Sequence, residues 1–356
     1  MVSKLNSLKN VLNGPVLVTG HTGFKGTWLT LLLEELGVEV LGYSLRPEEG
    51  SLFERIGREG AISEKYGDVR NFENIKDFIL RKRPVAVLHL AAQPLVIESY
   101  ETPHATFETN VMGTVNLLES SFQSDTVKTI IGITTDKVYK NDNKGGAFKE
   151  SDALNGKDPY SASKVGSEAA ISAWQQIAKS KGGPKVVAAR AGNVIGGGDW
   201  AKDRLIPDLI RGFSNNEVVM VRNPLSTRPW QHVLDPLLGY LFTLYEVLSG
   251  ENFEAINFGP KDSSLTVGEV VEIASKCWGP SAKVLIGNST ESVYEASKLD
   301  LDSAMATELL GWEPVWSQES AVENTILWWK SLILSEINPH ELCLNDIKYA
   351  LEKTTS

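Results

Sequence analysis

The sequence has few of the residues that mark secreted, metal-binding or membrane proteins. Its 356 residues include only two cysteines, Cys277 and Cys343, and five scattered histidines. Two thiols in a chain of this size favour a reducing compartment, and neither lies at a metal-ligand spacing. Residues 1–14 are polar and predict no signal peptide, and no apolar run approaches the length of a membrane span. We therefore expect a cytoplasmic protein with no metal site and no membrane partner.

An excess of positive charge is also missing. The formal net charge is -10 at pH 7, which argues against nucleic acid as a partner, although two or three local cations could still hold phosphates. Hydrophobic residues make up 42% of the chain and charged residues 22%, the balance of an ordinary globular protein. The length allows one large α/β unit, or a main domain with a second lobe.

Apolar patterning in the first half alternates between short buried strands and amphipathic helices. Strands are expected at 15–19, 38–43, 85–90, 127–134 and 185–190. Helices are expected at 24–36, 71–82, 104–122 and 159–180. Repeated β-α-β units with short links predict an α/β protein with a doubly wound parallel sheet, the Rossmann arrangement.

The alternation of strands and helices ends after about residue 191, where the loop that contains Gly196, Gly197 and Gly198 begins. We expect the dinucleotide-binding Rossmann domain to span 1–191, with part of 229–260 returning to it. A smaller, interleaved C-terminal α/β substrate lobe is expected over 192–330. Residues 331–356 have the pattern of an appended helical tail, to which we assign no function.

Three glycines follow the first expected strand and open the first expected helix. Gly20, Gly23 and Gly26 have the spacing G-x-x-G-x-x-G, which allows a tight turn and lets the backbone approach a pyrophosphate at a helix N-terminus. In this strand–turn–helix context the spacing predicts dinucleotide binding. Lys25, in the same turn, could reach the cofactor phosphates or weaken a packing contact.

The second strand does not supply the acidic residue that usually binds the adenosine ribose about 20 residues after the glycines. It ends in Ser44, Leu45 and Arg46. Arg46 could accept a 2′-phosphate, lie over the adenine, or remain solvated. The sequence therefore leaves the choice between NAD and NADP open.

Tyr160 and Lys164 are four residues apart, on one face of an expected helix. A tyrosine has a pKa near about 10 and is a poor base at neutral pH. A nearby ammonium and the positive charge of an oxidised nicotinamide would favour the phenolate. Because the pair follows a dinucleotide loop and a strand that ends in Thr134, Thr135 and Asp136, it predicts a tyrosine general base.

With these motifs the sequence resembles the extended short-chain dehydrogenases, the NAD-dependent epimerase/dehydratase family, over about residues 10–330. Thr-Asp-Lys-Val-Tyr at 135–139 is similar to the nucleotide-sugar 4,6-dehydratases, which commonly have Asp-Glu where this chain has Asp136 and Lys137. The resemblance rests on the segments 19–26, 90–92, 110–114, 135–139, 160–164, 190–200, 222–224 and 228–233. Residues 20–26 together with the last three segments narrow the resemblance to dehydratases of a CDP-linked glucose. UDP- and GDP-linked sugars stay open as substrates.

The resemblance implies a redox-neutral elimination in which a hydride leaves C4 of the sugar and returns to C6. It makes Tyr160 the base for the 4-hydroxyl, places Thr135 near the same oxygen, and makes Asp136 the general acid for the C6 hydroxyl. Lys137 would remove the C5 proton, orient the group that does, or only pair with Asp136. Because the ordinary pKa of lysine is about 10.4, the base role requires that burial near Lys164 lowers it.

The loop and the resemblance together assign the binding residues. Contacts with NAD, or with NADP, are expected from Gly20, Gly23, Phe24, Lys25, Gly26, Arg46, Asp68, Val69, Leu90, Ala91, Ala92, Asn110, Thr134, Tyr160 and Lys164. Contacts with the nucleotide sugar are expected from Gln93, Asn193, Arg204, Arg228 and Asn257. The family also implies a homodimer formed through the helices at 104–122 and 159–180.

Two other kinds of protein share parts of this pattern. An epimerase or reductase has the Thr, Tyr and Lys set but lacks an elimination acid, and Asp136 with Lys137 argues against it. A non-enzymatic dinucleotide sensor has the fold without turnover. Such proteins commonly lose the tyrosine or the lysine, whereas this chain has Tyr160 and Lys164.

Overall fold

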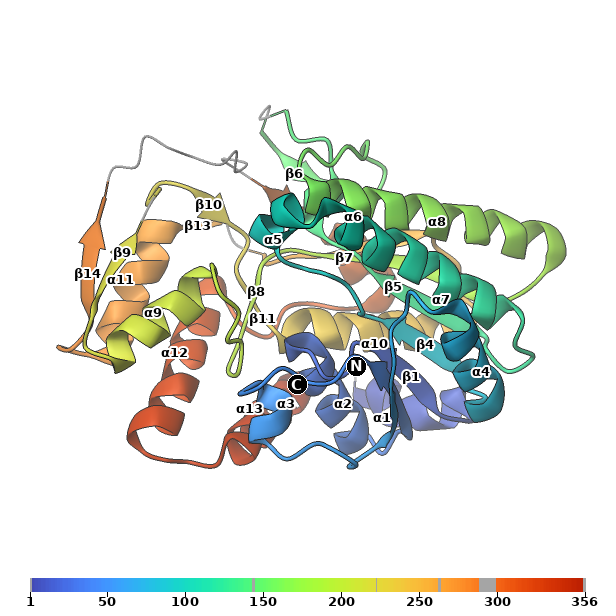
Figure 1. Cartoon of the computed structure of the whole chain (residues 1–356), viewed down its shortest axis with the longest axis horizontal. Helices are drawn as coiled ribbons and strands as arrows, with labels where there is room; N and C mark the ends of the chain where they lie inside the picture. The colour runs from blue at the N-terminus through green and yellow to red at the C-terminus, as the bar shows by residue number, and fades with distance from the viewer. Residues whose placement is uncertain (1, 143–144, 222, 262–263, 288–298, 355–356) are drawn as a thin grey trace.

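The computed structural model describes residues 2–142, 145–221, 223–261, 264–287 and 299–354 (Figure 1). Arg222, which belongs to one of the segments that carry the family resemblance, lies outside these ranges. Among the described residues, no helix is both long and apolar enough to cross a bilayer.

The centre of the molecule is a seven-stranded parallel sheet with the strand order β12-β7-β5-β4-β1-β2-β3. Its strands are β1 (Val16–Thr19), β2 (Val40–Ser44), β3 (Ser63–Tyr66), β4 (Ala86–His89), β5 (Thr129–Ile133), β7 (Lys185–Ala191) and β12 (Ala255–Phe258). The chain winds outward from β1 to β3 and then from β4 to β12, so the winding reverses between β1 and β4. The prediction of a doubly wound parallel α/β fold is confirmed.

The central strands β1, β4 and β5 are buried and largely apolar because both faces of the sheet are covered there, whereas the edge strand β3 is polar and partly exposed. In β1, Val16 and Val18 pack into one core and Leu17 into another on the opposite face. One face is covered by α4 (Phe72–Lys82), α7 (Gly113–Phe122) and α8 (Pro159–Lys181), and the other by α2 (Phe24–Glu35) and α10 (Leu234–Ser249) (Figure 1). The carboxyl ends of the strands are left to carry the site.

The helix expected at 104–122 is divided into three parts. The π-helix η1 (Glu108–Met112) separates α6 (Pro103–Phe107) from α7, and the short α5 (Val96–Glu101) precedes them. Its wider turn leaves the Asn110 carbonyl oxygen open to two hydroxyl donors, Thr114 Oγ1 at 2.6 Å and Ser167 Oγ at 2.7 Å. The π-turn therefore ties this helix to α8, and such turns frequently occur at functional sites.

The second half of the chain builds a smaller group of elements beside the sheet, shown on the left of Figure 1. Its helices are α9 (Leu205–Ser214), α11 (Val267–Trp278) and α12 (Gln318–Leu334). Its short strands pair as β8 (Val194–Ile195) with β11 (Gln231–His232), β9 (Val218–Val221) with β14 (Lys283–Ile286), and β10 (Thr227–Arg228) with β13 (Leu265–Thr266). A further pair, β6 (Ala147–Phe148) with β15 (Asp300–Leu301), joins residues far apart in the sequence. Between these elements the chain returns to the main sheet through α10 and β12.

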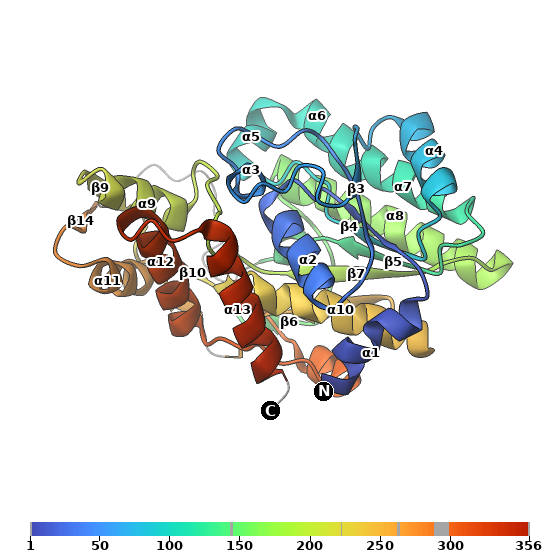
Figure 2. The same ribbon diagram turned by 90° about the horizontal axis from the view of Figure 1, so that it is seen from below.

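Both ends of the chain are helical and pack on the α2 and α10 side of the sheet (Figure 2). The first helix, α1 (Val2–Leu12), was not predicted; it lies against α10 and buries Leu5, Leu8 and Leu12. The last, α13 (Pro339–Lys353), contacts α2 and the short α3 (Leu52–Arg55). It buries Cys343, Ile347 and Ala350 completely, so the segment expected as an appended tail contributes to the core.

Candidate active site

The glycine-rich turn between β1 and α2 is too crowded for side chains. Gly20 has φ +73°, and a Cβ on it would lie 2.8 Å from the backbone nitrogen of Ala91. A Cβ on Gly26 would lie 2.1 Å from the carbonyl oxygen of Gly20. Gly23 stands at the N-cap of α2, where the helix presents its first N–H groups and a partial positive charge. This turn fits the pyrophosphate of a dinucleotide.

Substituting Gly26 by alanine is expected to weaken dinucleotide binding roughly tenfold or more, because the new methyl group collides with the Gly20 carbonyl oxygen. Isothermal titration with NAD measures the affinity, and a melting curve shows whether the variant is folded. Gly287→Ala is the control, since its Cβ meets its first neighbour at an ordinary 3.8 Å. A folded Gly26→Ala variant with unchanged affinity would show that the pyrophosphate binds elsewhere.

Beyond the turn, polar side chains fill the region where the adenosine is expected. The Arg46 guanidinium lies 4.9 Å from the centre of the Tyr66 ring. His21 Nε2 and Glu64 Oε2 are 2.7 Å apart, and both side chains are buried. Glu64, on β3, is therefore an acid close to the turn that sequence spacing did not find, but it is already paired with His21. Asp68, after β3, pairs with Arg70.

The segment after β4 lies directly beside the glycine-rich turn, at the point where the winding of the sheet reverses. The Ala91 N–H donates to Thr19 Oγ1 at 3.2 Å, and Thr19 Oγ1 is 2.7 Å from His89 Nδ1. Ligands of open α/β sheets bind outside the strand ends at this reversal. This position supports the expected cofactor contacts of Leu90, Ala91 and Ala92, which stay a prediction.

The residues after β5 form a compact acid–hydroxyl cluster. Thr135 Oγ1 donates to Asp136 Oδ1 at 2.8 Å and caps the single 3₁₀ turn of Asp136–Val138. The Asp136 side chain is 2% exposed. Lys137 Nζ donates to Asn193 Oδ1 at 3.2 Å and lies 3.8 Å from Asp136 Oδ1. A carboxyl group and an amine therefore sit side by side at the end of the strand.

Helix α8 brings Tyr160 and Lys164 to the same place. It begins with a capping box between Asp158 and Ser161, and the Tyr160 N–H donates to Ser99 Oγ at 3.1 Å. The Tyr160 side chain hydrogen-bonds that of Thr135, while Lys164 Nζ donates to the last carbonyl oxygen of β5, at Ile133, over 3.1 Å. The structure thus brings all five predicted catalytic residues together. Ser99, which fixes the start of the helix, was not predicted.

The electrostatics of this cluster suit an anionic ligand, whereas burial opposes ionisation of the tyrosine. Burial raises the pKa of Tyr160 to about 12, against the lowering effects of the Thr135 hydrogen bond and the Arg204 cation. Burial lowers the pKa of Lys164 to about 8. Burial also lowers the pKa of Lys25 to about 7, with further lowering by the cations Arg204 and Lys164. Without an added positive charge, Tyr160 is therefore protonated at neutral pH.

Of the five residues predicted to bind the sugar nucleotide, Asn193 and Arg204 interact with residues of the catalytic cluster. Asn193 contacts Lys137, and Arg204, paired with Asp199 at 2.8 Å, acts electrostatically on Tyr160. Arg228 lies on β10, where its Nη1 donates to the Thr227 carbonyl oxygen. The structure therefore brings Asn193 and Arg204 to the catalytic cluster.

Gln93 and Asn257 already have partners inside the protein. Gln93 Nε2 donates to Thr106 Oγ1 at 2.9 Å and to the Leu95 carbonyl oxygen at 3.1 Å. Asn257 is completely buried, with its Oδ1 accepting from Tyr139 and its Nδ2 donating to two backbone carbonyls. We therefore do not place the Asn257 side chain among the groups that contact a substrate.

The remaining predicted cofactor residues also have defined neighbours. Asn110 is buried, and its Nδ2 donates to Ser163 Oγ at 2.8 Å. Val69 is buried close to Gly113. Phe24 is partly buried against the main core. The hydroxyl group of Thr134 donates to Glu168 Oε1 at 2.5 Å.

A glycine-rich turn at the sheet's reversal point, next to a Tyr-x-x-x-Lys helix, defines a dinucleotide-dependent enzyme. The model of the NAD dependent epimerase/dehydratase family matches residues 16–259, and the chain belongs to this family.

Among curated proteins, the chain is 44% identical to the CDP-glucose 4,6-dehydratase of Salmonella typhimurium, covering 92% of this chain and 94% of the relative. Among solved structures it is similar to a UDP-glucose 4-epimerase of Thermotoga maritima (TM-score 0.79, 22% identity), covering 90% and 99% of the two chains. A dTDP-glucose 4,6-dehydratase of Bacillus anthracis has TM-score 0.76 and 23% identity, with 89% and 97% covered. These two structural likenesses concern the fold.

Proposed function

We propose that this protein is a nucleotide-sugar 4,6-dehydratase that converts CDP-glucose into CDP-4-keto-6-deoxyglucose and water. The observation that carries the proposal is the position of Asp136, a buried carboxyl group hydrogen-bonded to the threonine that also bonds Tyr160. A 4-epimerase needs no acid at this place, whereas an elimination does. The choice of CDP-glucose is supported by the 44% identity with the Salmonella enzyme.

The glycine-rich turn fits NAD as the dinucleotide, in keeping with the family. A bound NAD would supply reversible hydride transfer with the sugar, so that no external oxidant would be consumed. We propose that Gly20, Gly23 and Gly26 hold the pyrophosphate, with Arg46 at the adenosine end and Ala91 beside the β1 turn. NADP is tested as the alternative cofactor in the experiment below.

The chain's own residues perform the proton transfers. Tyr160, as a phenolate stabilised by the Lys164 ammonium, accepts the proton of the sugar's 4-hydroxyl group, which Thr135 orients. Asp136 donates a proton to the C6 hydroxyl group as the C6–O bond breaks. The proton from Asp136 leaves with the C6 hydroxyl group as water, and a base takes the C5 proton. The base gives a proton back to C5 when the hydride would return to C6, and the proton taken by Tyr160 restores Asp136 through solvent. Lys137 lies beside Asp136 and Asn193, where its amine serves as the C5 base or orients the sugar.

The diphosphate and the cytosine face the second half of the chain. We propose that Arg204, Asn193 and Arg228 bind the phosphates, since guanidinium groups are the preferred partners of phosphate oxygens. The division of the chain follows: 1–191 with the returning part of 229–260 hold the cofactor, and 192–330 close over the substrate. Both Cys277 and Cys343 are free thiols, which supports a reducing, cytoplasmic location.

The experiment is an incubation of the purified protein with CDP-glucose, without added cofactor and with NAD or NADP, followed by mass spectrometry. Loss of one water from the sugar nucleotide, with no net accumulation of reduced cofactor, is the expected result. A parallel panel of UDP-, GDP- and dTDP-glucose tests the base. Conversion of another member of the panel would correct the substrate, and no conversion of any would overturn the dehydratase assignment.

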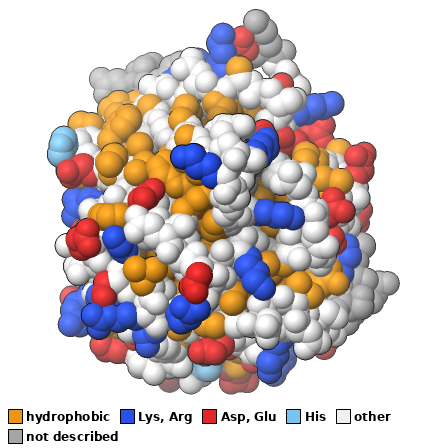
Figure 3. Space-filling view, turned by 90° about the vertical axis from the view of Figure 1, so that its right-hand side faces the viewer, with side chains coloured by type: hydrophobic (Ala, Val, Ile, Leu, Met, Phe, Trp, Pro, Cys, Tyr) orange, Lys and Arg blue, Asp and Glu red, His pale blue; other side chains and the backbone are white. Residues whose placement is uncertain are grey.

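We also propose that the protein is a homodimer. Ile97, Tyr100, Phe107 and Met112 are each between 41% and 49% exposed, and they come from α5, α6 and η1, which pack beside α8. Figure 3 shows hydrophobic side chains gathered on the side of the molecule that carries α7 and α8. Exposed apolar side chains in one area favour association, and a two-fold axis would bury them against their copies.

The double substitution Phe107→Glu and Met112→Glu is expected to give a monomer, because four like charges would meet across a two-fold interface. Size-exclusion chromatography with light scattering measures the mass. Leu225→Glu is the matched control, since Leu225 is 86% exposed but lies in the second half of the chain. A wild-type protein that is itself monomeric, or a double variant that stays dimeric, would contradict the interface.

A further inference from the structure

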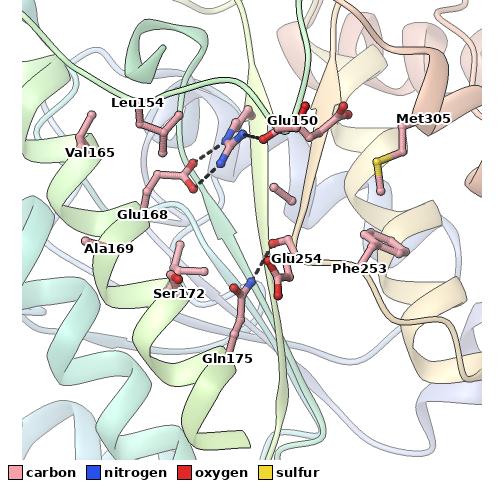
Figure 4. Close-up of a pocket in the computed structure, with 14 residues that line it drawn as sticks. Glu150, Leu154, Val165, Glu168, Ala169, Ser172, Gln175, Phe253, Glu254 and Met305 are labelled. Carbon is pink, nitrogen blue, oxygen red and sulfur yellow. Dashed lines mark hydrogen bonds and ion pairs between the residues drawn. The ribbon is translucent and has the colours of Figure 1, made fainter. Parts of the chain in front are cut away.

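A buried ion pair lies next to the end of β5, where it binds the hydroxyl group of Thr134. Arg190 of β7 and Glu168 of α8 form a bidentate pair, with Nε to Oε1 and Nη2 to Oε2 both at 2.9 Å. Their side chains are 6% and 5% exposed. Figure 4 shows the pair with its two dashed contacts, between α8 and the sheet. Burying a charged pair costs desolvation free energy and often adds little net stability. A role other than stabilising the fold is therefore expected for this pair.

Glu168 and Lys164 are one helical turn apart on α8. Their side chains hydrogen-bond two consecutive residues, Thr134 and Ile133, at the end of β5. Lys164 Nζ donates to the Ile133 carbonyl oxygen at 3.1 Å, and Thr134 Oγ1 donates to Glu168 Oε1 at 2.5 Å. The next residues in the chain are Thr135 and Asp136. The two charged side chains therefore fix the point at which the chain turns from β5 into the catalytic cluster.

We propose that Glu168, held in place by Arg190, is a positioning residue of the active site, which fixes the β5 end and keeps Lys164 in its ammonium form. This role rests on the proposed dehydratase function. Arg190 also donates to Tyr139 and to the Glu150 carbonyl oxygen, so its position is set independently of Glu168.

The charges around Lys164 show why a carboxylate is needed there. Burial lowers the pKa of Lys164 to about 8, and Glu168 is the group that raises it. Lys25, on α2, is a second amine beside Lys164, and repulsion from the Lys164 ammonium helps to lower the pKa of Lys25. His89, on β4, is neutral, since burial and Lys164 lower its pKa to about 3. Neutralising Glu168 therefore lowers the pKa of Lys164, and the ammonium is lost as the pH rises through a lower value than in the wild type.

Replacement of Glu168 by glutamine, which has the same shape, tests this role. A surface cavity of about 530 Å³ borders Glu168 and Arg190 and is also lined by Glu150, Gln175 and Glu254 (Figure 4). Glu168→Gln keeps the side chain's shape and an acceptor for Thr134, but removes the charge and replaces one of the two oxygens that accept from Arg190 by an amide nitrogen. The unpaired Arg190 that it leaves could destabilise the fold, so the double variant Glu168→Gln with Arg190→Gln accompanies it.

The experiment measures kcat and KM for CDP-glucose from acid to alkaline pH in both variants. Glu168→Gln is expected to lower kcat at neutral pH roughly tenfold, to leave KM within about twofold, and to move the alkaline limb of kcat to lower pH. The double variant is expected to keep the shifted limb although its melting temperature recovers. Thr134→Val, which removes the hydrogen bond and keeps the charge, should lower kcat without moving the limb.

A purely structural role predicts the opposite: the double variant would regain the wild-type pH profile together with its stability, and this would overturn the proposal. Trace acetylation of Lys164 at a series of pH values, read by mass spectrometry, gives its titration without turnover. The midpoint should fall in Glu168→Gln, and an unchanged midpoint would also overturn the proposal. If the wild-type protein dehydrates no sugar nucleotide but the midpoint still falls in Glu168→Gln, the dehydratase function would be refuted and the Glu168–Lys164 coupling would stand.

Discussion

Replacing Tyr160 by phenylalanine is expected to lower kcat for CDP-glucose by about 10²- to 10⁴-fold, the usual contribution of a general base. The ring remains in its buried position, but the oxygen that accepts the 4-hydroxyl proton is lost. Thr135 also loses one of its hydrogen-bond partners. The measurement is steady-state formation of the 4-keto-6-deoxy sugar, with circular dichroism and a melting curve to verify the fold.

Tyr349→Phe is the matched control for this substitution. Tyr349 is 44% exposed on α13, so the same chemical change there should leave turnover as it is. If folded Tyr160→Phe kept half of the wild-type rate, Tyr160 would not be the base and the assignment of the site would have to be abandoned.

Asp136→Asn is the second substitution with a large expected effect, again about 10²- to 10⁴-fold in kcat. The amide oxygen can still accept from Thr135, as Asp136 Oδ1 does over 2.8 Å, so the local geometry is kept. The amide has no acidic proton to give to the departing C6 hydroxyl group. Water loss should therefore stop, while binding of CDP-glucose, followed by isothermal titration, should change by less than about tenfold.

Asp152→Asn serves as the control for loss of a carboxylate. Asp152 lies in the turn before α8, where its carboxylate accepts from the Lys149 N–H, outside the cluster at the β5 end. A folded Asp136→Asn enzyme that still eliminates water at the wild-type rate would mean that another acid protonates the leaving group.

Most of the sheet could be predicted from the sequence because its strands are buried on both faces. Runs such as 85–90 and 185–190 are apolar except for His89 in the first and Lys185 and Arg190 at the ends of the second, and they correspond to β4 and β7. The N-terminal helix was missed because Leu5, Leu8 and Leu12 stand in an otherwise polar segment, and only α10 supplies the surface that buries them. The π-turn at Glu108–Met112 could not be predicted, since it depends on hydroxyl donors from α7 and α8.

The catalytic residues could be predicted from the sequence because each group of them lies within a few residues of the chain. A tyrosine and a lysine four residues apart share a helix face whatever the fold, and Thr135 and Asp136 directly follow a strand. Glu168 with Arg190, Ser99 beneath Tyr160, and Glu64 at His21 are tertiary contacts between distant elements. No pattern within one segment could have indicated them.

The order of strands along the chain has a consequence for biosynthesis. β12, which completes the sheet beside β7, lies 64 residues beyond the end of β7 in the sequence, counting from Ala191 to Ala255. A nascent chain that has emerged from the ribosome only as far as β7 has an open strand edge and lacks α10, the helix that covers this part of the sheet. Open edges of this kind pair readily with other chains. Chaperone dependence should therefore be greatest while residues 192–258 are being translated.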